Sequence, residues 1–250
     1  MEEIILEIEI KELRKQDHKK AIRWAIKGMN LNRYLDEGIL LDLYGRYFWN
    51  LELLKATQVI SAYYNDELVG ILLARMKDEK PVYKSFLKSI YVKVVDILQK
   101  AFAGKGVDSY DNANKELLAE YSRKVETDGE IVFLASNPDI KIKGVGTKLL
   151  QEFEKREKGK QVYLYTDDAC TYQFYDHRNF TRVGEKSIEL EIRGKTVPIT
   201  CMLYGKKIAT DNNNSNTNNV NKRISEENSI EKQQDKPRTI IKTDKEETER

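Results

Sequence analysis

One short stretch, residues 130–158, constrains the fold of this 250-residue chain more than any other. Its apolar run, Glu130–Ala135, stops at Asn137-Pro138, and the pair Gly144-x-Gly146 then opens an amphipathic run that ends near Lys158. The apolar run has the length of a buried strand, and the amphipathic run has the spacing of a helix. A further apolar run, Gln161–Thr166, predicts a second strand. The sequence therefore predicts a strand–helix–strand unit with parallel strands.

Hydrophobic periodicity predicts further elements on both sides of this unit. In chain order they are a strand over Ile4–Ile10, helices over 17–29 and 38–53, a hairpin of Ala56–Tyr64 and Leu68–Met76 turning at Asn65-Asp66-Glu67, a short helix around Thr171–Arg178, and a hairpin of Arg182–Ile192 and Lys195–Gly205. This order predicts a mixed α/β (α+β) fold. Its sheet is expected to be parallel only at the central crossover and antiparallel elsewhere.

A helical insertion of about 79–127 separates the third and fourth predicted strands. Val82–Phe102 places apolar residues at helical spacing, and Asn112–Val125 predicts a second helix. Several lysines accompany the apolar residues of the first helix. We expect that helix to pack on the domain with its lysine stems lying along apolar surface, and the alternative is a helix that lies on a membrane surface.

Composition bounds the rest of the chain. The Asn-rich and charged segment 208–250 is too polar to form a core, so we expect a domain over 1–207 followed by a disordered tail, which could alternatively fold on a partner. The 43 basic and 41 acidic residues nearly cancel, which argues against a nucleic-acid partner. With only two cysteines, no signal-peptide pattern and no apolar run long enough to span a membrane, we expect a cytoplasmic protein.

The glycine pair at the start of the predicted central helix indicates an anion site, where Gly144 and Gly146 are expected to leave room for phosphates because they have no side chains. A helix N-terminus offers unpaired backbone N–H groups and the positive end of the helix dipole, and Lys141 and Lys143 add charge beside it. The nucleotide P-loop pattern is missing, and Leu149 stands where the dinucleotide fingerprint needs a third glycine. The alternative reading of the glycine pair is an ordinary tight strand-to-helix connection.

Two motifs in the right order resemble a known family. Pro138-Asp139-x-Lys141-x-x-Gly144-x-Gly146 resembles the Gln/Arg-x-x-Gly-x-Gly/Ala signature of the GNAT superfamily of acyl-CoA N-acyltransferases, and Phe174–Phe180 is similar to its Tyr-x-x-x-Gly-Phe motif. The resemblance is strongest over 128–206. Lys141 and Asn179 depart from the family pattern. Asn tolerates the left-handed conformation well, so we expect the turn before Phe180 to survive.

The resemblance implies that acetyl-CoA is the acyl donor and that no metal is used. In the family the fourth and fifth strands splay apart, and the pantetheine arm pairs with the fourth strand while the pyrophosphate lies at the next helix. The cofactor-binding residues implied here are Leu134, Ala135 and Ser136 for the pantetheine arm, and Lys141, Ile142, Lys143, Gly144, Val145, Gly146 and Thr147 for the pyrophosphate.

The resemblance also implies catalytic roles. Tyr175 matches the family's general acid, with Tyr172 as a substitute, although Tyr175 could equally serve only to pack its helix. An attacking amine needs a base. Glu130 is the first candidate for this base, and Asp168 is the alternative. Glu130 could instead be a solvated residue at the end of its strand, without a catalytic role.

Other reactive side chains carry weaker signals. Cys170 has no histidine in a context that suggests a catalytic pair, so we expect a small buried apolar residue there. His18 and His177 are expected on the surface of helices, and the histidines and cysteines show no metal-ligand spacing.

We therefore expect an N-acetyltransferase that transfers the acetyl group directly to a primary amine of a small molecule or peptide, without a covalent enzyme intermediate. Acceptor choice is expected to depend on the loop 29–34 and on Tyr44, Arg46, Tyr47 and Trp49, although such aromatics are more often core. The rival hypothesis is a non-catalytic acyl-CoA-sensing module that acts through a protein partner. The oligomeric state stays open.

Overall fold

The structure is a computed structural model that describes residues 7–28, 38–102, 107–192 and 195–210. Contacts divide the chain into two units, Met1–Ile208 and Ala209–Arg250, and the first holds all the helices and strands described here. The predicted tail after residue 210, the start of the first predicted strand and the predicted acceptor loop 29–34 lie outside the described residues.

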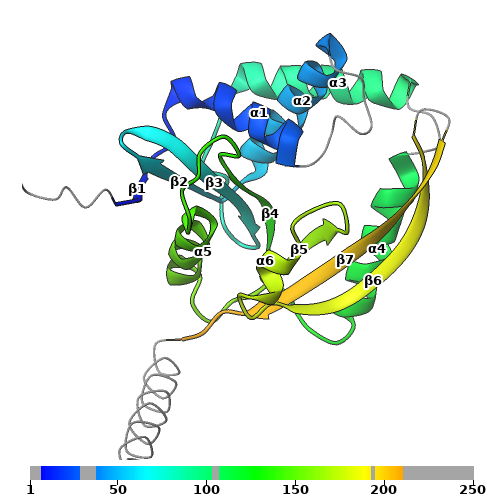
Figure 1. The fold of residues 1–250 in the computed structure, drawn as a ribbon. Coiled ribbons are helices and arrows are strands. Elements are labelled where there is room, and N and C mark those ends of the chain that lie inside the picture. Colours follow the sequence, from blue (N-terminus) through cyan, green and yellow to red (C-terminus); the bar gives the residue numbers. More distant parts are fainter. Residues whose placement is uncertain (1–6, 29–37, 103–106, 193–194, 211–250) are drawn as a thin grey trace, which may run out of the picture. The chain divides into compact units, whose positions relative to one another are not determined.

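The described residues form a mixed sheet with helices on both faces (Figure 1). In chain order the elements are β1 (Glu9–Lys11), a 3-10 turn (Lys15–Asp17), α1 (His18–Gly28), α2 (Ile39–Lys55), β2 (Gln58–Tyr64), β3 (Glu67–Met76), α3 (Phe86–Phe102), α4 (Val107–Ser122), β4 (Gly129–Ser136), α5 (Val145–Arg156), β5 (Gln161–Asp167), α6 (Gln173–Asp176), β6 (Thr181–Ile192) and β7 (Lys195–Lys207). The strand order is β1-β2-β3-β4-β5-β7-β6, and only β4 and β5 run parallel. The predicted fold class is confirmed.

The β2–β3 hairpin turns on two residues. Asn65 and Asp66 have φ angles of 49° and 62°, and Tyr64 pairs directly with Glu67. Successive positive φ values match the right-handed twist of the flanking strands, and Asn and Asp tolerate them. The prediction that Glu67 belongs to the turn is wrong, because that residue is already in β3.

Three apolar clusters hold the helices against the sheet. Trp24, Trp49 and Leu53 from α1 and α2 pack on one face of β2–β4, while Leu149 and Phe153 from α5 pack on the other. Leu117 of α4 packs with residues of the β6–β7 hairpin. In β4, Phe133 belongs to the cluster with α1 and α2 and Ile131 to the cluster with α5, so the strand is buried on both faces just beyond its pairing with β5.

Helix α3 leaves its apolar stripe exposed. Phe86, Ile90, Val94 and Ile97 have exposed fractions of 79%, 43%, 50% and 66%. The helix contacts α2 through its other side, where the Tyr91 hydroxyl donates a 3.0 Å hydrogen bond to the Leu43 carbonyl. The helix therefore packs on the domain as expected, but through α2 and not through its apolar stripe. In the part of the chain that the structure describes, no helix combines the length and the apolar character needed to cross a membrane.

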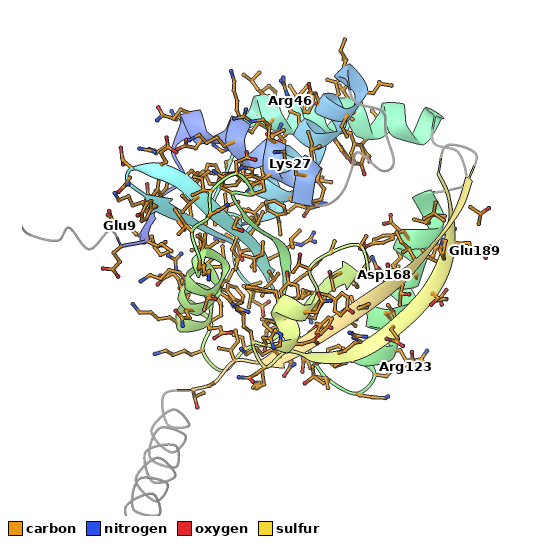
Figure 2. All side chains as sticks on the ribbon, in the orientation of Figure 1. Glu9, Lys27, Arg46, Arg123, Asp168 and Glu189 are labelled. Atoms are coloured by element: carbon orange, nitrogen blue, oxygen red, sulfur yellow. The ribbon has the colours of Figure 1, made fainter. Side chains whose placement is uncertain are left out.

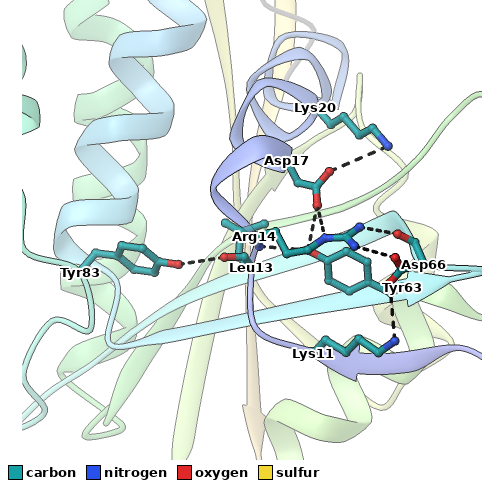
Figure 3. A network of polar contacts seen from close by, with 8 residues as sticks. All are labelled: Lys11, Leu13, Arg14, Asp17, Lys20, Tyr63, Asp66 and Tyr83. Carbon is teal, nitrogen blue, oxygen red and sulfur yellow. Dashed lines mark hydrogen bonds and ion pairs between the residues drawn. The ribbon is translucent and has the colours of Figure 1, made fainter.

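A polar network fixes the segment between β1 and α1 to the β2–β3 hairpin (Figure 3). The buried Asp17 carboxylate accepts hydrogen bonds of 2.9 Å from Arg14 Nε and 3.1 Å from the Tyr63 hydroxyl. The Arg14 guanidinium also lies 4.5 Å from the Tyr63 ring centre and pairs with Asp66 in the hairpin turn. Because the charges and hydroxyl satisfy one another, this buried carboxylate has a structural role.

Candidate active site

Strands β4 and β5 separate soon after they meet. They pair only at Gly129–Val162 and Glu130–Tyr163, although β4 continues to Ser136 and β5 to Asp167. On its other side β4 has a bulge: Phe133 pairs with Leu73 and Ile131 with Ala74, so no residue of β3 pairs with Val132. A bulge bends its strand and increases the local twist. This bend coincides with the start of the splay, which leaves the β5-facing edge of β4 beyond Glu130 without a strand partner among the described residues.

The N-terminus of α5 follows the open end of this splay. Gly144 is the N-cap, with a φ of +86° that favours glycine, and no side chain caps the helix. The first backbone N–H to find an acceptor within the helix is that of Lys148, which donates to the Gly144 carbonyl at 2.9 Å. Lys141 and Lys143 are exposed beside it, whereas Ile140 and Ile142 pack against the α5-side core. The loop can therefore present amides and positive charge to an anion.

Gly146 is required for a different reason from the one the sequence suggested. A Cβ at this position would lie 3.0 Å from the Phe174 ring, so the space is filled by the first turn of α6. Nothing lies within 4 Å of a Cβ placed on Gly144. The interpretation that both glycines clear room for phosphates is therefore wrong for Gly146, where glycine lets α6 dock on α5.

Arg178 is a functional candidate that the sequence reasoning missed. Its guanidinium donates from one Nη to the Thr147 hydroxyl in the first turn of α5 and from the other to the Phe174 carbonyl at 3.0 Å. It also stacks 3.7 Å from the Phe174 ring centre. The residue stood inside the second motif, but a single arginine in a turn carries no periodic signal that could reveal this contact.

Tyr175 of α6 packs in the core on the α5 side of the sheet. Its ring centre lies 5.2 Å from Phe174, 5.6 Å from Phe180 and 6.0 Å from Tyr204. The Tyr175 hydroxyl keeps its proton at neutral pH, as tyrosine ordinarily does, and burial raises its pKa further, which makes it a weaker acid. A proton donor needs that state.

Glu130 lies at the closed end of the splay, on the α2 side of the sheet. Its carboxylate accepts hydrogen bonds of 2.9 Å from Arg75 and 3.4 Å from the Tyr163 hydroxyl, and its side chain is 16% exposed. The reading of Glu130 as a solvated strand end is therefore wrong. A surface hollow is lined here by Arg75, Met76, Lys77, Gly129, Glu130 and Tyr163. Glu130 and Tyr175 thus lie on opposite faces of the sheet.

The substitute candidates lie elsewhere. The Tyr172 ring packs 5.1 Å from the Arg182 guanidinium. Asp168 is exposed at the end of β5 and accepts a 3.2 Å hydrogen bond from the Thr200 amide (Figure 2). Its neighbour Asp167, which the sequence reasoning passed over, is buried and accepts a 3.0 Å hydrogen bond from the Tyr110 hydroxyl. The alternation of β5 could have predicted that Asp167 is buried, because residues 163, 165 and 167 lie on the same face of the strand.

The cysteine and the histidines have structural surroundings. Cys170 is partly buried with Sγ 3.9 Å from the Gly28 carbonyl, and burial raises the pKa of its thiol to about 12, which disfavours the nucleophilic thiolate. His177 is exposed as expected. His18 is only half-exposed and accepts a 3.1 Å hydrogen bond from Trp49 Nε1, so the expectation of a surface histidine is wrong there.

The residues expected to select the acceptor divide between core and surface. Trp49 and Tyr47 are buried, Tyr44 is half-buried and Arg46 is exposed on α2. The C-terminus of α1 comes closer to the splay: a Cβ on Gly28 would lie 4.0 Å from Ala135 Cβ near the end of β4. The C-terminus of α1 therefore lies near the open end of the splay.

Comparisons with known proteins bear on the fold. No protein-family model and no curated protein matches the sequence. Among solved structures, an agmatine N-acetyltransferase matches with a TM-score of 0.54 at 11% identity. The match covers 80% of this chain and 99% of the agmatine N-acetyltransferase chain. A polyamine N-acetyltransferase from Drosophila melanogaster matches with a TM-score of 0.53 at 12% identity, covering 80% of this chain and all of its own. The chain therefore has the fold of the GNAT N-acetyltransferases, as its two motifs predicted.

Proposed function

We propose that the chain is an N-acetyltransferase that transfers the acetyl group of acetyl-CoA to a primary amine. The observation that carries the proposal is the splay of β4 from β5 beside an uncapped α5 N-terminus. An unpaired strand edge can bind the amide groups of a pantetheine arm, and a free helix N-terminus can bind a diphosphate. A donor that contains both groups in sequence fits this arrangement.

The donor would lie along β4. Its diphosphate would meet the amides of Gly144–Thr147, with Lys141 and Lys143 at the rim. The pantetheine arm would then pair with the main chain of Leu134, Ala135 and Ser136. This path brings the thioester toward the bulge at Val132, where a main-chain N–H can stabilise the oxyanion that forms during attack.

The chemistry would use the two faces of β4 for two proton transfers. The amine nitrogen attacks the thioester carbon, and the Glu130 carboxylate accepts the proton that the nitrogen loses. When the C–S bond breaks, the protonated Tyr175 hydroxyl donates to the departing thiolate. Base and acid lie on opposite sides of the strand, as Glu130 faces α2 and Tyr175 faces the α5-side core.

The acceptor would be a cationic amine. Glu52 and Glu130 both approach Arg75 Nη2, at 3.8 Å and 2.9 Å, so two carboxylates surround one guanidinium. The Glu52 side chain is only 11% exposed, and one of its oxygens is buried without a hydrogen-bond partner among the described residues. Arg75 and Lys77 also line this hollow, but the two carboxylates can accept hydrogen bonds from an ammonium group, which an anion cannot donate. The agmatine and polyamine acetyltransferases among the structural matches are named for acceptors of this kind.

A thiol-release assay with acetyl-CoA and a panel of primary amines tests the proposal. We expect turnover with at least one amine, and we expect Glu130→Gln to lower kcat about 100-fold or more because the base is lost. Glu152→Gln, which alters an ion pair on the outer side of α5, is the matched control and should leave kcat unchanged. Tight acetyl-CoA binding without turnover on any amine would refute catalysis and favour the acyl-CoA-sensing hypothesis.

A further inference from the structure

The contacts of Arg178 place a guanidinium at the first turn of α5. The residue follows α6, and its side chain returns across the Phe174 ring to the Thr147 hydroxyl. Phe174 in turn fills the space above Gly146. Stacking on an aromatic ring orients an arginine more tightly than a lysine in solvent, because the plane of the guanidinium is fixed.

Hydrogen-bonding capacity remains on both partners. A guanidinium has five N–H donors, and the described structure uses one on each Nη. Arg178 Nε has no partner among the described residues but is buried, so the donors left for a ligand are the remaining N–H groups of the two Nη atoms. Thr147 accepts from Arg178 through its oxygen, so its own O–H proton is free to donate. An acceptor that reaches this point would meet a charged fork and a hydroxyl together.

We propose that Arg178 adds a guanidinium to the diphosphate site at Thr147, where the two side chains form a subsite for one phosphoryl group of the donor. This inference rests on the proposed function, because it presumes a donor at the α5 N-terminus. It adds an oriented charge to those of the exposed Lys141 and Lys143, because Arg178 is held in place by three contacts. Arginine forks bind phosphate oxygens with defined geometry, and lysine binds them as a point charge.

The subsite has a consequence for donor choice. A donor that carries a diphosphate gains from Arg178, whereas a pantetheine thioester without phosphate does not. The enzyme should therefore discriminate by the nucleotide end of the donor, far from the thioester. The 3′-phosphate of CoA is not part of the subsite, so removal of that group should leave the contribution of Arg178 intact.

Calorimetric titration of the full chain with CoA, 3′-dephospho-CoA and pantetheine tests the subsite. We expect Arg178→Ala to weaken binding of CoA and 3′-dephospho-CoA by about 10- to 100-fold, as for a lost charged hydrogen bond, and to leave pantetheine binding unchanged. Thr147→Val should show the same pattern with a smaller loss. Arg178→Lys should recover part of the affinity because it restores the charge without the fork.

Arg182→Ala is the matched control. Arg182 also stacks near an aromatic ring, that of Tyr172, but it hydrogen-bonds to Tyr204 and Glu185 and has no contact with α5 among those described. CoA affinity should survive this change.

An equal loss for all three ligands in Arg178→Ala would overturn the subsite and show that Arg178 only braces the structure. A loss for CoA alone would overturn it by assigning Arg178 to the 3′-phosphate. If the wild type binds CoA and Arg178→Ala binds it equally well, the subsite alone is overturned. If the wild type binds no CoA, the proposed function is overturned as well.

Discussion

Two residues with left-handed backbone conformations shape the candidate site. Gly144 has a φ of +86° at the start of α5, and Asn179 has a φ of +58° just before the buried Phe180. The expectation that Asn179 keeps the turn is confirmed, because asparagine adopts this region more readily than other non-glycine residues. Gly144 begins a helix that no side chain caps, and Asn179 forms the turn that leads Phe180 into the core.

Replacing the Tyr175 hydroxyl tests the proposed acid. Tyr175→Phe keeps the ring contacts with Phe174 and Phe180, so we expect the thermal unfolding midpoint to change little. We expect kcat to fall about 100-fold or more with CoA affinity unchanged, because only proton donation is removed. Tyr172→Phe is the control, in which kcat should stay near wild type. Equal kcat values for Tyr175→Phe and wild type would assign Tyr175 to packing alone.

His18 should make stability depend on pH. Burial, with a further contribution from Lys88, lowers its pKa to about 4, below the unfolded value of about 6.5. The unfolded state therefore binds more protons between these values, so the free energy of unfolding falls as pH drops from about 6.5 to 4. After a discount for partial exposure, the loss from this residue is roughly 1 kcal/mol. Urea unfolding of wild type and His18→Gln across that range should show a weaker pH dependence in the variant. Parallel curves would contradict the assignment.

At the scale of elements, α5 and α6 form one unit around the glycine at 146, and α3 stands apart with an exposed stripe. Phe153 of α5 is fully buried, whereas Phe86 of α3 is 79% exposed. Both helices have amphipathic sequences. The difference lies in what each helix contacts: α5 covers one face of the central strands, while α3 packs beside α2 at the outer side of the molecule's described part.

A pair of matched substitutions tests this difference. Phe153→Ala should lower the free energy of unfolding by about 3 to 5 kcal/mol, because it opens a cavity in the core. Phe86→Ala should change it by only about 0.5 kcal/mol or less, since little apolar surface is lost from the core. Chemical denaturation of the two variants measures both values. A large loss for Phe86→Ala would mean that the stripe of α3 is covered in solution.

The elements were predictable from sequence where periodicity and turn chemistry agree. The strand–helix–strand unit around Gly144 and the hairpin at Asn65 follow from local signals, and both are confirmed. Three features depend on tertiary contacts and had no local signal: the Phe174 ring above Gly146, the Arg178 bond to Thr147 and the exposure of Phe86. An amphipathic pattern predicts a helix without saying what covers its apolar side.

At the scale of the whole described molecule, the sheet opens at one place. Its order, β1-β2-β3-β4-β5-β7-β6, is continuous except where β4 leaves β5, and helices cover both faces around that opening (Figure 1). Glu130 marks the closed end and the α5 N-terminus follows the open end. The predicted splay is therefore the feature through which sequence motifs, sheet topology and the proposed chemistry agree.

Amide chemical shifts on titration with CoA would locate the donor on the chain residue by residue. If the donor lies in the splay, the largest perturbations should fall on the backbone N–H groups of Val145, Gly146 and Thr147 and on those of residues 131–136 along the free edge of β4. A saturable CoA interaction that leaves these amides unperturbed, or the lack of any interaction at millimolar CoA, would contradict the account.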